Sequence, residues 1–260
     1  MRDETPARSV FGRAVAVLAA FSGAGGRDLT LTELAQRTGL PLTTAHRLCG
    51  QLVQEGMLER RPDGGYRVGL RLWELGMLAP RTHGLREAAL PFLEDLYEVT
   101  HQNVQLVVLD GIETVVVERL RARESVRLVS RAGGRLPVHA TSGGIALLAH
   151  ADAATLARVL EAPMPRFTDA TIQSEHELRA ALSSARRQGW VELREHLTPR
   201  STSIAAPILL KEGHAVAAVS LVGSVAEETR SLIPALLTSA RGIARSLGRE
   251  EQRGGGVRRA

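Results

Sequence analysis

The sequence predicts an α+β fold in two domains, an N-terminal winged helix-turn-helix and a C-terminal antiparallel sheet with helices inserted between its strands. The chain has 260 residues, of which 44% are hydrophobic, and this length favours two cores over one. Three segments with helical periodicity and a glycine-rich hairpin lie before residue 70, and paired β-branched runs follow residue 100. Together these observations define the fold class.

The first predicted helix runs from Val10 to about Ser22, where the glycine-rich stretch SGAGG ends it. Thr30 and Glu33 stand three residues apart before the next apolar run. This is the spacing of a capping box, in which each side chain accepts a hydrogen bond from the backbone of the other residue. Gly39 is predicted to end this second helix in the left-handed conformation.

A third helix is predicted over residues 41–55, because Pro41 suits the first turn of a helix and Gly56 suits its end. Residues 57–60 and 66–68 flank the turn PDGG, which is a hairpin signal. Three helices with a tight turn between the last two, followed by a small hairpin, are typical of a winged helix-turn-helix.

The third helix has two different faces. Its apolar arc contains Ala45, Leu48, Cys49 and Leu52. In a helix-turn-helix the start of this helix enters the major groove, where Arg47 is the best candidate to read a base. The predicted DNA contacts are Thr43, Thr44, His46, Arg47 and Gln51 on the helix, and Arg60, Arg61 and Arg67 on the wing. The alternative is a merely solvated face, but the agreement of capping box, turn and hairpin favours DNA binding.

The segment LRLWELGMLA, residues 70–79, predicts a linker helix, and the break at residues 80–84 predicts the domain boundary. The predicted organisation is a flexible N-terminus (1–8), the winged helix-turn-helix (9–70), the linker helix and break (71–84), the second domain (85–248) and a disordered tail (249–260).

The second domain alternates helices with paired strands. Asp110 and Gly111 join two β-branched runs in a hairpin, and the segments STSIAAPILL and HAVAAVSLVG predict another hairpin. A further strand is predicted in SVRLVS, before a glycine turn. The predicted helices cover residues 85–100 despite Pro91, two segments within 143–162 separated by the cap Asp152, residues 178–188, and residues 227–247 with Pro234 inside the pattern.

Composition narrows the function classes. The net charge of +5 at pH 7 permits a polyanionic partner. Cys49 is the only cysteine, which excludes an internal disulfide and favours a reducing compartment. No segment reaches the roughly 18 apolar residues of a membrane span, so we expect a cytoplasmic protein without a membrane partner.

No catalytic, metal or cofactor site is predicted. Ser142 lies near His139 in sequence but outside a G-x-S-x-G elbow. The eight histidines and Cys49 do not fall at metal-ligand spacing, and the GG pairs form neither a dinucleotide-binding nor a phosphate-binding loop. The residue pattern therefore argues against an enzyme.

The segment HATSGGIALL predicts a ligand site. Thr141, Ser142, Gly143 and Gly144 stand at a predicted helix start, so hydroxyls and free backbone N–H groups converge where the helix dipole is positive. Such a place attracts anions. The alternative is that Ser142 only caps the helix and that the glycines permit close packing.

The chain resembles the IclR-type bacterial transcriptional regulators in several separate motifs. The similar segments are LTLTELAQRTGLPLTTAHRLCGQLVQEGML, YRVGLRLWELG, LPVHATSGGIALLAH, GWVELREHL and IAAPI, and they span roughly residues 9–248. The resemblance implies a GAF-like C-terminal domain that binds a small effector, often an organic acid or an aromatic metabolite. It also implies homodimers or homotetramers on palindromic operator DNA, and it places Leu128, Ser203 and Ser220 at the effector pocket.

The expected function is therefore a sequence-specific DNA-binding regulator, a repressor or an activator, controlled by a small-molecule effector. Two positions depart from the family pattern: Ile145 stands where a lysine is usual, and Arg200 where a glycine is common. These departures leave an alternative open, a constitutive DNA-binding regulator whose C-terminal domain only mediates oligomerisation.

Overall fold

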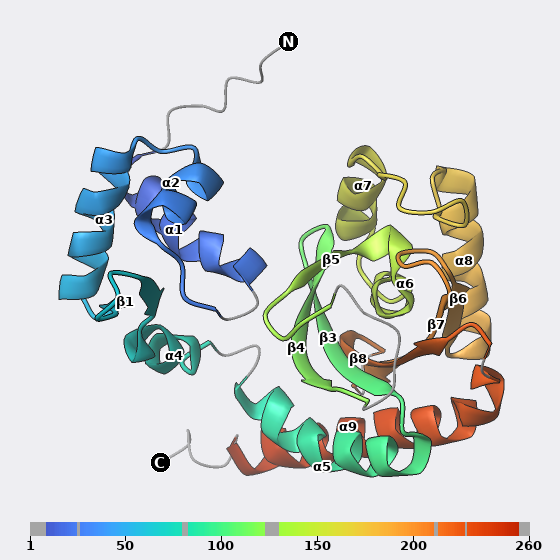
Figure 1. The fold of residues 1–260 in the computed structure, drawn as a ribbon. Helices are drawn as coiled ribbons and strands as arrows, with labels where there is room; N and C mark the ends of the chain where they lie inside the picture. The colour runs from blue at the N-terminus through green and yellow to red at the C-terminus, as the bar shows by residue number, and fades with distance from the viewer. Residues whose placement is uncertain are drawn as a thin grey trace. The chain divides into compact units, whose positions relative to one another are not determined.

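The computed structural model describes residues 9–24, 27–79, 83–122, 130–210, 213–226 and 228–254. The chain forms two compact units, Met1–Pro80 and Arg81–Ala260, each with its own hydrophobic packing (Figure 1). Residues 1–8, for which the sequence predicts a flexible end, and Leu128 lie outside the described residues. None of the helices in the described ranges combines the length and the apolar character that a bilayer span requires.

The first unit has the architecture of a winged helix-turn-helix, as predicted. Its described elements are α1 (Val10–Ala20), the 3₁₀ turn η1 (Phe21–Ala24), α2 (Leu31–Thr38), α3 (Leu42–Gln54), β1 (Leu58–Arg60), β2 (Tyr66–Val68) and α4 (Leu70–Gly76). In the hairpin Arg60 pairs with Tyr66, and the backbone N–H of Leu29 donates to the Tyr66 carbonyl at 2.9 Å. This extra hydrogen bond ties the wing to the segment that leads into α2.

The turn between α2 and α3 has the end signals expected from the sequence. The backbone N–H of Glu33 donates to Thr30 Oγ1 at 3.2 Å, and the Thr30 N–H donates to Glu33 Oε2 at 2.9 Å. The Thr30 N–H, helped by the Arg27 guanidinium, lowers the pKa of Glu33 to about 2. Gly39 ends α2 with a φ of 69°, a left-handed conformation that glycine adopts without strain. The direction in which α3 leaves this turn is therefore set by local chemistry.

The apolar arc of α3 packs into the core of the first unit. Leu48, Cys49 and Leu52 are buried in one cluster with residues such as Val17 and Leu34. Burial raises the pKa of the Cys49 thiol to about 11, so the thiol stays protonated and unreactive near neutral pH. The polar arc of α3 is left on the outside.

The second unit is built on one antiparallel sheet, with the strand order β5-β4-β3-β8-β7-β6 among the described residues. The strands are β3 (Asn103–Asp110), β4 (Glu113–Leu120), β5 (Arg135–Pro137), β6 (Val191–Arg194), β7 (Ser201–Leu209) and β8 (Ala215–Ser224). β3 pairs with β8 in the middle of the sheet, so two segments far apart in sequence become neighbours.

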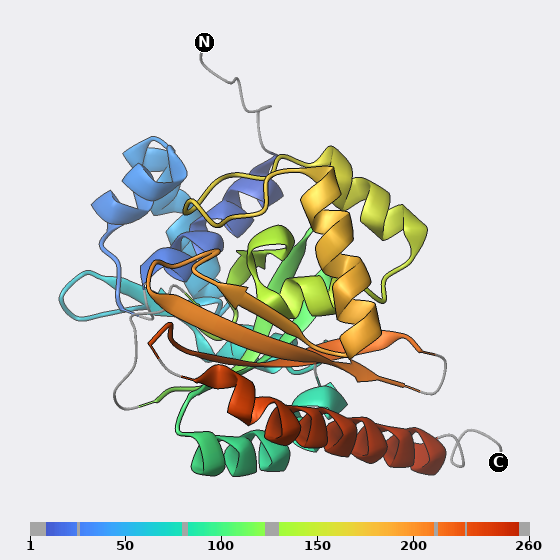
Figure 2. The ribbon, with the colours of Figure 1, turned by 90° about the vertical axis from the view of Figure 1, so that its right-hand side faces the viewer.

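Helices cover both faces of this sheet (Figure 2). On one face lie α5 (His83–Thr100) and α9 (Ile233–Gly254), and on the other lie α6 (Ser142–Leu148), α7 (Ala153–Glu161) and α8 (Glu175–Gln188). Successive side chains of β3 point to opposite faces of the sheet. Leu106 therefore packs in the core between the sheet and the helices α5 and α9, and Val107 packs in the core between the sheet and α6. Pro91 lies inside the continuous helix α5.

The C-terminal helix differs from its prediction at both ends. It begins at Ile233, after the 3₁₀ turn η3 (Thr229–Leu232), so the predicted start near residue 227 is wrong. Pro234 falls in the first turn, where its missing N–H breaks no helical hydrogen bond. The helix continues to Gly254, so the prediction of disorder is wrong for residues 249–254. Glutamate, glutamine and arginine are good helix formers and extend a helix that is already nucleated and packed.

Three other elements show where periodicity is a weak guide. The strand predicted in SVRLVS falls mostly on residues 123–129, which lie outside the described ranges, and β5 follows the glycine turn instead. β6 has only four residues, too few for a clear alternation. α8 begins at Glu175, earlier than residue 178, because Ser174 and Glu177 form a second capping box.

Candidate nucleic-acid interface and ligand pocket

The residues proposed to meet DNA from α3 lie together on its outer face. Thr43, His46, Arg47 and Gln51 are exposed, and Thr44 is half-buried. Arg47 Nη1 donates a long hydrogen bond of 3.3 Å to Gln51 Oε1, one turn further along the helix. This contact between exposed groups holds the guanidinium along the helix surface without burying it. The donors of Arg47 thus remain available to an external acceptor.

The three wing arginines are in different electrostatic situations. The Arg67 Nε donates to Glu59 Oε2 at 2.7 Å, and this contact raises the pKa of Arg67. Arg61 Nε lies 3.1 Å from Asp28 Oδ2, within ion-pair distance but without hydrogen-bond geometry. Arg60 is exposed and pairs with no acid in the described part of the chain. Exposed ion pairs typically stabilise a fold by only about 0–1 kcal/mol, so a DNA phosphate can displace the carboxylate of Glu59 or Asp28. Arg60 can bind a phosphate without displacing any described acid.

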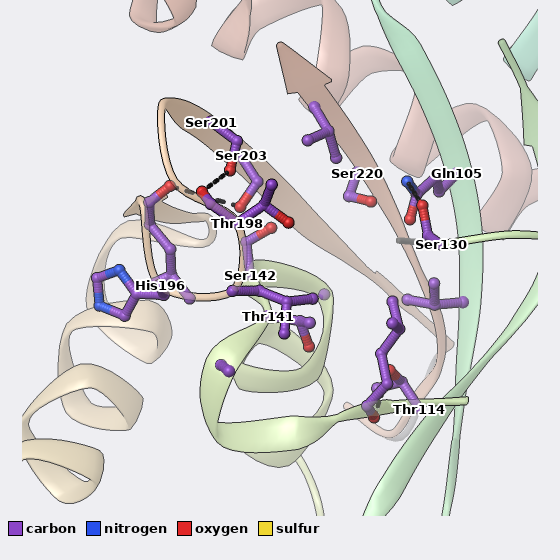
Figure 3. Close-up of a pocket in the computed structure, with 17 residues that line it drawn as sticks. Gln105, Thr114, Ser130, Thr141, Ser142, His196, Thr198, Ser201, Ser203 and Ser220 are labelled. Carbon is purple, nitrogen blue, oxygen red and sulfur yellow. Dashed lines mark hydrogen bonds between the residues drawn. The ribbon is translucent and has the colours of Figure 1, made fainter. Parts of the chain in front are cut away.

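The second unit contains a pocket between α6, the middle strands and the loop at residues 195–200 (Figure 3). The empty space inside it, including its open mouth, is about 580 Å³. Its polar lining residues are Gln105, Thr114, Ser130, Thr141, Ser142, His196, Thr198, Ser201, Ser203 and Ser220. Apolar side chains from β3, β5, β6 and β8 complete the wall.

The pocket brings together most of the residues predicted to bind an effector. Thr141, Ser142, Gly143, Ser203 and Ser220 all line it. Gly144 is not among the lining residues: a Cβ there would lie 2.4 Å from the carbonyl oxygen of Val138, so this glycine serves close backbone packing. The prediction for Leu128 falls outside the described residues.

The start of α6 separates two roles that the sequence left undecided. Thr141 caps the helix, because its Oγ1 accepts the Gly144 N–H at 3.2 Å. The interpretation of Ser142 as the cap is therefore wrong. Ser142 and Ser220 are only 2% and 3% exposed, and their hydroxyls form no hydrogen bond with a described group. Since α6 has only seven residues, these hydroxyls, more than a helix dipole, define the polar character of the wall.

Several pocket residues were missed by sequence reasoning. Gln105 interrupts the apolar run of β3 and is 4% exposed, and its Nε2 donates to Ser130 Oγ at 2.8 Å. A buried amide inside a strand was a usable signal, because it has the same side-chain direction as Val107. His196, Thr198 and the loop they belong to offered no such signal.

The loop at residues 195–200 closes one side of the pocket and is held by one hydrogen bond from outside the loop and one within it. Thr171 Oγ1 donates to the His196 carbonyl at 2.7 Å, and the Arg200 backbone N–H donates to Glu195 Oε1 at 2.6 Å. Both Glu195 and Arg200 adopt left-handed backbone conformations, with φ values of 60° and 57°. For side-chain-bearing residues this conformation stores strain, which glycine would avoid at the position of Arg200.

Arg200→Gly is expected to stabilise the protein. Relief of the left-handed strain contributes about 1–2 kcal/mol, and the greater freedom of glycine in the unfolded chain offsets about half of it. The free energy of unfolding measured by urea denaturation should rise by roughly 0.5–1 kcal/mol. Gly189→Ala, at a φ of 78°, is the matched control and should lower it. An Arg200→Gly protein less stable than wild type would contradict the strain argument.

The two departures from the family pattern leave the pocket lining intact. Ile145 is fully buried in the core beneath α6 and does not line the pocket. Arg200 is exposed and also absent from the lining.

His139 is buried with its Nε2 3.1 Å from the Pro165 carbonyl oxygen. Within the described ranges, no group of three or more histidine, cysteine or acidic residues is arranged to hold a metal ion.

A winged helix with an exposed polar recognition helix, together with a separate unit that contains a ligand pocket, defines a class of protein: a DNA-binding transcriptional regulator that responds to a small molecule. Comparison with known families agrees. Residues 11–62 match the IclR helix-turn-helix domain, and residues 78–249 match the bacterial transcriptional regulator IclR C-terminal domain. The chain belongs to the IclR family of transcriptional regulators.

Individual relatives are similar over most of their length. The chain is 34% identical to the regulator XynR of Escherichia coli over 196 residues, covering 75% of this chain and 78% of XynR. It is 32% identical to the glycerol operon regulatory protein of Streptomyces coelicolor, covering 92% and 94%. Among solved structures, an IclR homolog from Microbacterium hydrocarbonoxydans complexed with 4-hydroxybenzoate is 37% identical with a TM-score of 0.84, covering 92% of this chain and 99% of the homolog.

Proposed function

We propose that this regulator binds palindromic operator DNA as a homodimer or a pair of dimers, and that a small organic acid or aromatic metabolite in the pocket changes this binding. The proposed DNA contacts are Thr43, Thr44, His46, Arg47 and Gln51 on α3, and Arg60, Arg61 and Arg67 on the wing. The proposed effector contacts are Thr141, Ser142, Gly143, Ser203 and Ser220, together with Gln105 and Ser130. Residues 80–84 are the proposed boundary between the DNA-binding and effector-binding domains.

The observation that carries this proposal is a pair of hydroxyls, those of the nearly buried Ser142 and Ser220, which line the pocket and have no hydrogen-bond partner among the described groups. A ligand that covered these two hydroxyls with apolar atoms would leave them unpaired, at a cost of about 1–3 kcal/mol each, so a ligand with oxygen atoms at these places is favoured. The apolar remainder of the wall suits a hydrocarbon or aromatic body. The 4-hydroxybenzoate complex of the Microbacterium homolog supports the same chemical class.

A second copy of the chain is the proposed partner of two apolar surfaces in the first unit. On α4 none of the residues is buried, and Leu70 and Trp73 are each 64% exposed. On α1, Phe11 is 78% exposed. A seven-residue helix that buries none of its side chains gains little stability within one chain. Packing of its apolar side chains against a second copy would bury them and stabilise the helix. A symmetric dimer would also match the symmetry of a palindromic operator.

Effector titration tests the proposed function. Full-length protein, bound to a fluorescent operator fragment, is titrated with aliphatic and aromatic carboxylates and with their amides. We expect at least one compound to change the operator dissociation constant by about tenfold, within the usual range of allosteric coupling. Ser142→Ala combined with Ser220→Ala should weaken the response without changing operator affinity in the absence of the compound.

Two alternatives are outcomes of the same experiment. If no compound alters operator binding or raises the thermal unfolding midpoint, the chain is a constitutive DNA-binding regulator whose second unit only assembles oligomers, because a ligand that binds the folded state must stabilise it. If a bound compound is chemically converted on incubation, the pocket is an active site. We infer that neither occurs, and that the chain catalyses no reaction.

A further inference from the structure

The pocket has two polar ends with different chemistry. Gln105 and Ser130 lie together at one end, His196 and Thr198 lie at the other, and Ser142 lies between them (Figure 3). None of the lining residues in the described part of the chain is an arginine, a lysine or an acid. An anionic ligand would therefore meet only neutral donors at first contact, and such a lining alone gives little preference for a charged ligand over a neutral one of the same shape.

A cation lies directly behind the Gln105 end. Arg119 on β4 stands opposite Gln105 on β3 in the strand register, so the two side chains leave the same face of the sheet. The Arg119 Nη1 donates to the backbone carbonyl of Ser130, and its Nη2 donates to Asn103 Oδ1 at 3.2 Å. Gln105 Nε2 donates to the side chain of the same Ser130. The Arg119 guanidinium therefore lies behind Ser130, which lines the pocket, and its hydrogen bond holds the Ser130 backbone in place.

The charge of Arg119 is poorly compensated. Its Nε is buried and donates to no described group. No carboxylate in the described ranges forms an ion pair with its guanidinium: the Glu118 carboxylate accepts the Arg119 backbone N–H and pairs with Arg86. The like charge of Arg121 acts on the guanidinium. Burial, followed by this repulsion, lowers the pKa of the Arg119 guanidinium, although arginine keeps its proton in proteins. A half-buried cation that forms no ion pair with any described acid leaves positive potential at this end of the pocket, where solvent screens it weakly.

We propose that Arg119 makes the pocket selective for anionic effectors, with the carboxylate of the effector held at the Gln105 and Ser130 end. This inference rests on the proposed function. Arg119 is a positioning and charge-selecting residue that acts through Ser130 and Gln105, since it does not itself line the pocket. The hydroxyls of Ser142 and Ser220 meet the middle of the ligand, and Thr198 meets a second polar group at its other end.

A merely structural role for Arg119 makes a different prediction. If the guanidinium only braced the Ser130 backbone and Asn103, its loss would weaken the binding of charged and neutral ligands equally. If it supplies charge, its loss would weaken only the binding of anions. The ratio of affinities for an acid and for its amide isostere therefore separates the two roles, because the two ligands have nearly the same shape and differ by one unit of charge.

The test uses isothermal titration calorimetry on the full-length protein with three acid and amide pairs: benzoate and benzamide, 4-hydroxybenzoate and 4-hydroxybenzamide, and phenylacetate and phenylacetamide. We expect the wild type to prefer acids by about tenfold, the scale of one charge acting through a partly buried wall. Arg119→Met and Arg119→Gln should bring the ratio close to one, whereas Arg119→Lys should retain most of it. Arg121→Met is the matched control on an exposed side chain and should change the ratio little.

The outcomes separate this inference from the function on which it rests. Equal binding of acids and amides by the wild type, or an acid preference that survives in folded Arg119→Met or Arg119→Gln, overturns the role of Arg119 and leaves the effector pocket intact. Binding of none of the six compounds overturns the proposed ligand class and the inference with it. Unfolding midpoints of the variants without ligand show which variants are folded, and only folded variants are compared with the wild type.

Discussion

Arg47→Ala is expected to lower affinity for the preferred operator by about 5- to 150-fold and to flatten the preference among operator variants. Arg47 is exposed on α3, and its only side-chain hydrogen bond among the described residues is a long one to Gln51. A guanidinium in this situation can turn to the major groove and pair with a guanine edge at little cost. Fluorescence anisotropy against operators with single base-pair changes measures both affinity and preference.

Arg60→Ala is the matched control for this experiment. Arg60 is exposed and unpaired by any described acid, so we expect it to bind a phosphate, and its removal should weaken all sequences alike. The slope of log affinity against log salt should become shallower by about 0.9 if Arg60 neutralises one phosphate of the operator. If Arg47→Ala and Arg60→Ala gave the same pattern across operator variants, Arg47 would have no role in base readout.

The winged helix could be predicted from the sequence because its decisive signals are local. The capping box of Thr30 and Glu33 is a spacing of three residues, and Gly39 is a single backbone requirement; both are present in the structure. The two arcs of α3 follow from helical periodicity, and Leu48 and Cys49 are buried as this periodicity requires. Tertiary packing adds to these features but does not have to override them.

The pocket could be predicted only in part, because it forms where distant segments meet. The segment of Thr141 and Ser142 was found from its own residue types, and Ser203 and Ser220 only through a family resemblance. Nothing local indicates that Gln105 and Ser130 share an end of the pocket, since this follows from the pairing of β3 with β4 and from the hydrogen bonds of Ser130 with Gln105 and Arg119. The left-handed φ of Arg200 also has no local cause in its residue type; the hydrogen bond from its N–H to Glu195 helps to hold it.

Trp73→Glu is expected to convert the protein to monomers and to weaken operator binding by about 100- to 10,000-fold. A preformed dimer brings its second recognition helix to the second half-site at high effective concentration, and a monomer loses this advantage. The indole of Trp73 is 64% exposed on a helix without buried residues, so a carboxylate there has little effect on the fold of one chain. In a dimer interface the same carboxylate would be buried without a partner, at a large cost.

The control is Val99→Glu, which places the same charge on another exposed apolar residue, 71% exposed and in the second unit. Analytical ultracentrifugation at micromolar protein should show dimers or larger species for wild type and Val99→Glu, and monomers for Trp73→Glu. Both variants should keep the wild-type circular dichroism spectrum. A Trp73→Glu protein that remained dimeric and bound operator like the wild type would remove the exposed face of α4 from the interface. Something other than a dimer interface would then have to stabilise α4, because so short and exposed a helix has little stability of its own.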